Sequence, residues 1–176
     1  EGVALQPLYT ERPSGALWRE VAPAPFRICM RGGDAAAMKE DVAGGADALW
    51  CSLDEVPAGV KTFFVLEPGS LALAKLPAKD FALALDALSV PPAQLADVVK
   101  KVSGPSVVVS TVRYHDAGAD PADELACALA TGAACLRSLE GVSVEQAAKA
   151  MWLRVPVGRE TFVELCKLRA LRTCWA

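Results

Sequence analysis

Short apolar runs alternate with helical segments along most of the chain, and this alternation constrains the fold more than any other feature. Near-continuous apolar strands separated by helices are typical of a parallel sheet covered on both faces. The sequence therefore predicts an α/β fold whose strands are joined by right-handed crossovers. The six predicted strands cover residues 26–31, 48–53, 62–66, 81–85, 106–112 and 151–157.

Capping residues indicate where the helices begin and end. Asp34 precedes a predicted helix over 35–43, and a second helix over 91–101 opens with two prolines. Asp120 and the proline after it form an N-cap with proline at the first helical position, which predicts the longest helix over 121–138. A last helix is predicted to carry its apolar side chains on one face, at Phe162, Leu165, Leu168, Leu171 and Trp175.

The domain organisation follows from proline content and from the number of strand-helix units. Residues 1–25 contain four prolines without a regular period, which indicates an extended arm lying on a neighbouring subunit. Residues 26–176 form one predicted (β/α) barrel-type domain. Because about six units are fewer than the eight of a standard barrel, we expect a TIM-barrel-like parallel barrel that is reduced or truncated, or an open sheet. The chain begins with Glu1, so we also expect a processed product or a piece of a longer protein.

Charge and cysteine usage exclude several classes of protein. The net charge of -3 and the scattered basic residues argue against nucleic-acid binding. Uninterrupted apolar runs are too short for a membrane-spanning helix. The cysteines form no CxxC pair and lie in apolar segments, so we interpret them as buried thiols in a reducing cytoplasm rather than as disulfides or zinc ligands. They are Cys29, Cys51, Cys127, Cys135, Cys166 and Cys174.

Three segments resemble the methylmalonyl-CoA mutase family. Residues 107–136 read VVVSTVRYHDAGADPADELACALATGAACL, which is similar to the family's fifth barrel strand and the helix after it. Residues 161–176 read TFVELCKLRALRTCWA and resemble the family's sixth helix, and LQPLYT at 5–10 resembles the arm that leads into the barrel. The resemblance implies a (β/α)8 barrel threaded by coenzyme A, and an adenosylcobalamin-dependent interconversion of methylmalonyl-CoA and succinyl-CoA.

The residues that perform this chemistry in the family are missing here. Catalytic members read SGYHMQEAGA where this chain reads STVRYHDAGA, so Arg113 occupies the position of the catalytic histidine. His115 is the single histidine and lies two residues further along the predicted strand, a shift of about 6.5 Å on the same face. Asp86 is the remaining polar residue of the segment that aligns with the fourth strand. We therefore assign no catalytic residue, and Arg113, His115 and Asp86 stay weak candidates.

The resemblance implies the non-catalytic small (beta) subunit, which would form a heterodimer with a catalytic (alpha) subunit. That partner would carry the adenosylcobalamin, because the DxHxxG cobalamin motif does not occur in this chain. No cofactor or metal site is expected here, and acyl-CoA binding is disfavoured. One alternative is an active acyl-CoA mutase or CoA-binding isomerase with altered site residues, and another is a stand-alone protein built on a reduced barrel. Four acids that resemble a metal cluster are interpreted mainly as helix caps: Asp116, Asp120, Asp123 and Glu124.

Overall fold

The strands of the protein run parallel in two sheets, in which each strand pairs with the next one along the chain. The computed structural model describes residues 26–67 and 80–175, so the predicted arm over 1–25 lies outside the described residues. One sheet has the order β1-β2-β3-β4 and the other the order β5-β6-β7. The strands are β1 (Cys29–Arg31), β2 (Ala48–Ser52), β3 (Phe63–Glu67), β4 (Phe81–Leu83), β5 (Leu85–Asp86), β6 (Val107–Ser110) and β7 (Met151–Arg154).

The predicted strand over 81–85 is divided at Ala84, and each half belongs to a different sheet. The Leu83 N–H donates to the Pro105 carbonyl beside β6 at 2.9 Å, whereas the Ala84 N–H donates to the Leu66 carbonyl of β3 at 2.8 Å. The segment thus changes partners within two residues and carries the parallel order from β3 to β6. Among the described strands, none pairs with the outer edge of β1 or of β7, so these residues form open parallel sheets.

Most of the predicted helices are confirmed, because local caps define their ends. The Asp34 carboxylate accepts from the N–H groups of Ala36 and Ala37 at 2.9 Å each, and Asp120 caps its helix in the same way. A helix over 144–150 was not predicted, although Ser143 and Gln146 form a capping box there. The helices are α1 (Ala35–Ala43), α2 (Pro92–Lys101), α3 (Val112–Asp116), α4 (Pro121–Ser138), α5 (Val144–Ala150) and α6 (Thr161–Trp175), with a 3-10 turn, η1, at Leu53–Glu55.

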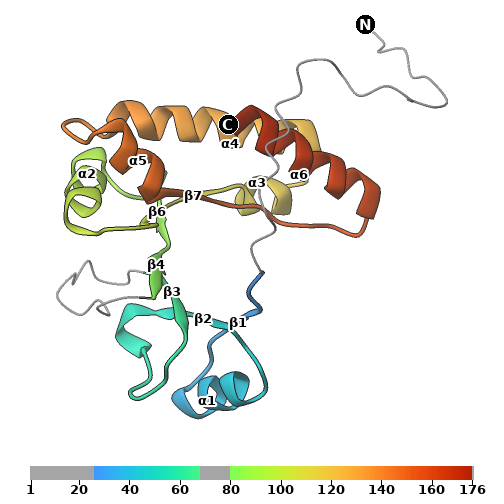
Figure 1. Ribbon diagram of the computed structural model, residues 1–176. Helices are drawn as coiled ribbons and strands as arrows, with labels where there is room; N and C mark the ends of the chain where they lie inside the picture. The colour runs from blue at the N-terminus through green and yellow to red at the C-terminus, as the bar shows by residue number, and fades with distance from the viewer. Residues whose placement is uncertain (1–25, 68–79, 176) are drawn as a thin grey trace, which may run out of the picture.

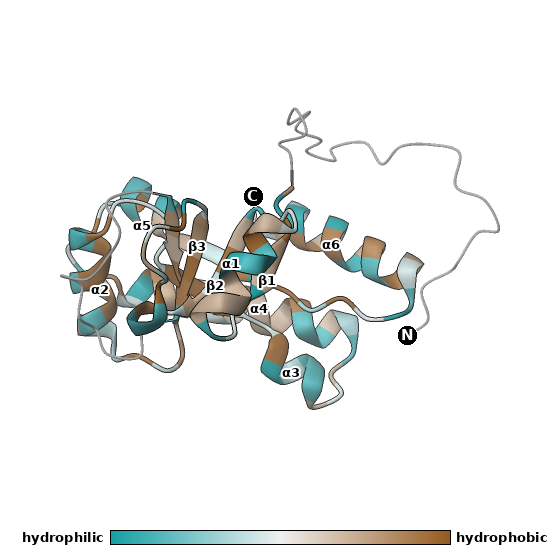
Figure 2. Ribbon diagram, turned by 90° about the horizontal axis from the view of Figure 1, so that it is seen from below, coloured by the Kyte–Doolittle hydropathy of each residue, from teal (hydrophilic) through white to brown (hydrophobic). Residues whose placement is uncertain are grey.

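The core lies between the strands and the helices that cover them. Helices α2, α4, α5 and α6 surround the sheet of β5, β6 and β7, whereas α1 lies beside β1 and β2 (Figure 1). In the view coloured by hydropathy the strands are mainly hydrophobic, whereas the helices carry both hydrophilic and hydrophobic residues (Figure 2). Leu49, Leu66, Leu83 and Val107 are fully buried at 0% exposure, so both sheets contribute to one core.

The prediction of buried thiols is wrong for three cysteines. Cys29, Cys166 and Cys174 are exposed rather than buried. The reason is that β1 is an edge strand and that Cys166 and Cys174 lie at exposed positions of α6. All six thiols are free, and Cys51 and Cys135 are buried as predicted.

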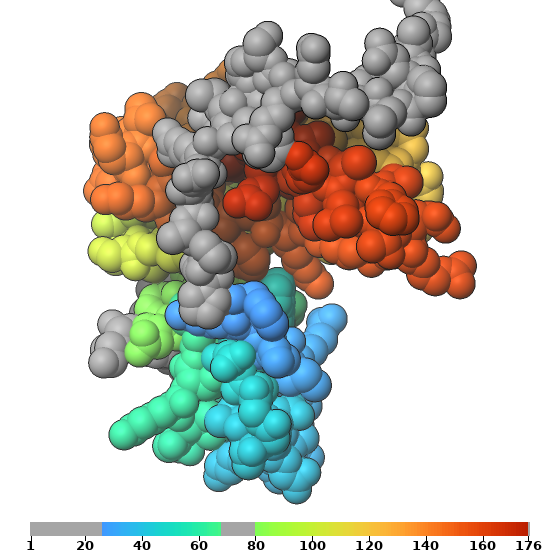
Figure 3. All heavy atoms as spheres, turned by 45° about the vertical axis from the view of Figure 1, so that its right-hand side comes forward, coloured from blue at the N-terminus to red at the C-terminus, as the bar shows by residue number. Residues whose placement is uncertain are grey.

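The predicted apolar face of the last helix is wrong at Phe162 and Leu165, whereas Leu171 is buried as predicted. In α6, Phe162 is 85% exposed and Leu165 is 52% exposed, while Glu164, Lys167 and Leu171 are buried. The helix forms part of the molecular surface in the space-filling view (Figure 3). Ion pairs with α4, described below, decide which side of α6 faces inward. No helix within the described ranges is long and apolar enough to cross a membrane.

Candidate functional site

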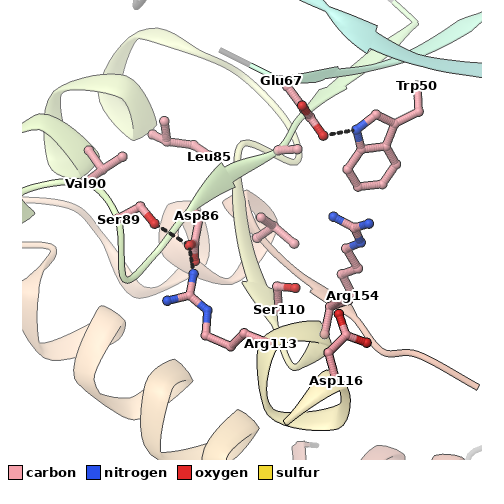
Figure 4. Close-up of a pocket in the computed structure, with 13 residues that line it drawn as sticks. Trp50, Glu67, Leu85, Asp86, Ser89, Val90, Ser110, Arg113, Asp116 and Arg154 are labelled. Atoms are coloured by element: carbon pink, nitrogen blue, oxygen red, sulfur yellow. Dashed lines mark hydrogen bonds and ion pairs between the residues drawn. The ribbon is translucent and has the colours of Figure 1, made fainter. Parts of the chain in front are cut away.

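A cavity of about 470 Å³ lies where several parallel strands end. Glu67, Asp86, Ser110 and Arg154 line it, and each is the last residue of its strand: β3, β5, β6 and β7 respectively. The carboxyl ends of the strands are where proteins built from β/α units carry their functional sites. Figure 4 shows these side chains converging on one space together with residues of helix α3.

Two of the three candidate residues meet in this cavity. The guanidinium of Arg113, on α3, forms a hydrogen bond and ion pair with the carboxylate of Asp86. Asp86 also accepts from the Ser89 hydroxyl at 2.5 Å and from the Leu88 N–H at 3.2 Å. Both oxygens of Asp86 are therefore occupied, and Arg113 is fixed against the wall of the cavity (Figure 4).

The opposite side of the cavity carries an aromatic and cationic arrangement that the sequence analysis did not single out. The Arg154 guanidinium lies 4.4 Å from the centroid of the Trp50 ring, in cation–π geometry. The Trp50 Nε1–H donates to Glu67 Oε1 at 2.6 Å, which holds the ring in place. The sequence could have indicated Arg154 only through its position at the carboxyl end of a predicted parallel strand.

A second indole fills the space between the two sheets. The rings of Trp50, from β2, and Trp152, from β7, lie 6.0 Å apart between centroids with planes tilted by 59°. The Trp152 Nε1–H donates to the Leu83 carbonyl at 2.8 Å. These contacts connect strands that share no backbone hydrogen bonds.

The third candidate, His115, does not face the cavity. Arg113 and His115 were predicted to lie on a strand, but β6 ends at Ser110 and both residues lie on α3. Successive residues of a helix are rotated by about 100°, so residues two apart point in nearly opposite directions. His115 Nδ1 accordingly lies 2.7 Å from Glu124 Oε1 on α4, away from Arg113. The shared facing expected for a strand is wrong.

Behind α3, His115 joins a buried cluster of charges between α4 and α6. The ammonium of Lys167 lies 2.7 Å from Glu164 Oε2 and 3.2 Å from Glu124 Oε2, and it donates to the Pro156 carbonyl at 3.0 Å. The hydrogen bond from Lys167 lowers the pKa of the Glu164 carboxyl, against the opposing effect of burial. Burial lowers the pKa of Lys167, but its hydrogen bonds to Glu164 and Glu124 outweigh burial and leave that pKa raised.

The four acids of the segment after β6 separate rather than converge. Asp116 lies at the rim of the cavity, and Asp120 caps α4. Asp123 follows in the first turn of α4, while Glu124 belongs to the buried cluster. The capping interpretation is confirmed for Asp120, and Glu124 has a different role, because its charge pairs with Lys167. Within the described residues no group of three or more His, Cys, Asp or Glu side chains has an arrangement that would hold a metal ion.

These features define an α/β protein of parallel strands with a polar, ligand-sized cavity at the carboxyl ends of the strands. Residues 98–176, which include β6, β7 and the helices α3 to α6, match the family model described as methylmalonyl-CoA mutase. Over this segment, which is a little less than half of the chain, the sequence is similar to that family.

Two curated relatives carry the same description of a methylmalonyl-CoA mutase small subunit. They come from Streptomyces virginiae and from Propionibacterium freudenreichii subsp. shermanii, and each is 40% identical over 73 residues. The match covers 40% of this chain but only 12% and 11% of the two relatives, respectively. The relationship therefore concerns the second half of the chain, which holds Arg113, Arg154 and the buried cluster.

Proposed function

We propose that the chain is a non-catalytic small-subunit-like domain of an adenosylcobalamin-dependent methylmalonyl-CoA mutase. In this role it supports a catalytic subunit that interconverts methylmalonyl-CoA and succinyl-CoA, as one half of a heterodimer. The names of the two curated relatives favour this role, and a cytoplasmic location agrees with six free cysteines.

The main support for this proposal is where Arg113 and His115 lie and which residues they contact. Arg113 occupies the aligned position of the catalytic histidine, and its guanidinium is held by Asp86. The single histidine of the chain, His115, pairs with Glu124 on the other side of α3. A fixed cation cannot replace a neutral imidazole as a hydrogen-bond partner that also exchanges protons. The polar groups at the strand ends thus favour a role other than the radical rearrangement.

The architecture supports the same proposal. A (β/α) barrel-type wall agrees with parallel strands that pair in sequential order. In a catalytic barrel of this family the coenzyme would pass along the axis, whereas here Trp50 and Trp152 pack against one another between the sheets. The lining of the cavity offers no imidazole that could bind a cobalt ion, so adenosylcobalamin is assigned to the partner.

A direct test combines an assembly measurement with an activity measurement. The purified chain is mixed with the catalytic subunit from the same source and analysed by size-exclusion chromatography with light scattering. We expect a one-to-one complex, and no succinyl-CoA when the chain alone is supplied with methylmalonyl-CoA and adenosylcobalamin. Elution as separate species would contradict the subunit assignment. Turnover by the chain alone, abolished in Arg113→Ala, would instead favour the alternative of an active acyl-CoA mutase.

The exposed apolar start of α6 provides an interface variant for this test. Phe162 is 85% exposed, and Phe162→Asp removes apolar surface without disturbing the core. Val144→Asp on α5 is a matched control, because Val144 is 78% exposed and the substitution adds the same charge. We expect Phe162→Asp to weaken the complex at least about tenfold, as truncation of an aromatic interface anchor commonly does, and Val144→Asp to leave it unchanged.

A further inference from the structure

Arg154 differs from Arg113, which shares the cavity, and from the nearby Arg31, because no carboxylate among the described residues pairs with it. Arg113 pairs with Asp86, and Arg31 lies 3.8 Å from Glu67. Among the described residues, no carboxylate forms an ion pair with Arg154, and its guanidinium stacks over Trp50. Stacking uses the face of the guanidinium and leaves the N–H groups around its edge able to donate.

The surroundings of Arg154 suit a small ligand with an apolar part. The cavity of about 470 Å³ falls within the usual range for small-molecule sites. The hydroxyl of Ser110 lies in the same space, between Arg154 and Arg113 (Figure 4). The remaining lining is largely apolar and comes from Trp50, Ala84, Leu85, Val90, Val108 and Val112.

The charges around the cavity select for a ligand with a single negative charge. Asp86 is neutralised by Arg113, but Asp116 and Glu67 add two further carboxylates to the lining. A guanidinium binds a carboxylate in a bidentate manner, which needs only one free arginine. A phosphate dianion would bring a second charge close to these carboxylates, with no second free cation to offset it.

We propose that this cavity binds a small monocarboxylate, whose carboxylate is held by Arg154 and whose short apolar chain lies against Trp50 and Val108. The ligand class is an aliphatic acid of a few carbons. This proposal goes beyond the subunit assignment and does not depend on it, because binding is measured on the chain without a partner.

The test is a calorimetric titration of the full chain with butyrate, with the neutral isostere butyramide, and with inorganic phosphate. We expect saturable butyrate binding with a dissociation constant on the order of 1 mM, a range consistent with the size of the ligand. Butyramide and phosphate should each bind at least about tenfold more weakly, because one lacks the charge and the other carries too much. In an NMR titration the Trp50 indole N–H resonance should move with butyrate, while that of Trp175, outside the cavity, should not.

Variants locate the site. Arg154→Gln should weaken butyrate binding at least about tenfold. Arg154→Lys keeps the charge but loses the paired N–H groups that bind a carboxylate in a bidentate manner, so it should give an intermediate loss. Arg159→Gln is the matched control, since Arg159 is exposed and lies outside the cavity lining. Equal affinity for butyrate and butyramide, tighter binding of phosphate, or no butyrate binding up to about 50 mM would each overturn the proposal. These comparisons use the unmodified chain, so they decide the matter even if Arg154→Gln does not fold.

Discussion

Helix α3 separates two charged networks that differ in their access to water. On the cavity side, the Arg113 side chain is 48% exposed, and Arg154 has no carboxylate partner among the described residues. On the other side, the Lys167 side chain is 0% exposed and lies between Glu124 and Glu164. The charges of the first network are open to solvent. Those of the second are buried, contact one another directly and connect α6 to α4.

Replacing the central cation of the buried cluster should have the largest effect. Lys167→Met leaves Glu124 and Glu164 without their common partner in a space closed to water. Breaking a buried ion pair by removing one partner costs about 3–5 kcal/mol, because the remaining charge is not compensated. We expect a loss of that size in the free energy of unfolding, measured by urea denaturation at pH 7.

The control for this variant is Lys149→Met on α5, where the lysine is exposed. It should change the free energy of unfolding by no more than about 0.5 kcal/mol. Equal effects of the two substitutions would mean that the cluster does not hold α6 in place.

Acid should weaken the buried cluster from the carboxylate side. The pKa of Glu164 is lowered from 4.5 in the folded protein, so its contribution is complete above that value and is lost as the pH falls through the folded pKa. The pKa of Lys167 is raised from 10.5, so its contribution is complete below that value and is lost at higher pH. The cluster therefore stabilises the protein fully between about pH 5 and pH 10.

The variant Glu164→Gln tests this pH dependence. Its effect at pH 7 should be smaller than that of Lys167→Met, because Glu124 still pairs with the lysine. Urea denaturation between pH 3 and pH 7 should show that the difference from the unmodified chain shrinks as the pH falls. Glu145→Gln, at an exposed position on α5, should give a constant difference near zero. A difference for Glu164→Gln that grows toward acid would contradict the assigned direction of the pKa.

The elements with local signals were the ones that could be predicted. Asp34 and Asp120 accept from backbone N–H groups two and three residues ahead, so the starts of α1 and α4 can be recognised within four residues of sequence. Arg113 was also found from sequence, because it lies in the segment that matches the family model, whereas Asp86 was singled out from a resemblance outside that segment. Their contact was not foreseen, since 27 residues separate them.

Non-local contacts explain what the sequence could not indicate. Thr111 makes no side-chain cap, and the β-branched pair Thr111 and Val112 favours a strand, so α3 has no local signal. The buried side of α6 is decided by Lys167 and Glu124, which are 43 residues apart. The spacing of apolar residues alone had predicted that the side of α6 carrying Phe162 would be buried. The contact between Arg154 and Trp50 is also non-local, because the two residues lie on strands of different sheets.

The smallest effect on stability should come from the cation on the cavity side. Arg113→Met makes the same kind of change as Lys167→Met, but the Arg113 side chain is 48% exposed and water screens its pair with Asp86. Exposed ion pairs contribute about 0–1 kcal/mol, so urea denaturation at pH 7 should show a loss within that range.

The same variant should nevertheless weaken butyrate binding several-fold, because Asp86 then adds an unmatched negative charge to the cavity. Asp86→Asn combined with Arg113→Met should restore most of the affinity, since it removes that charge. A loss of stability as large as that of Lys167→Met would mean that both networks are structural. A small loss of stability together with weaker binding is the outcome expected if α3 divides a ligand site from a structural cluster.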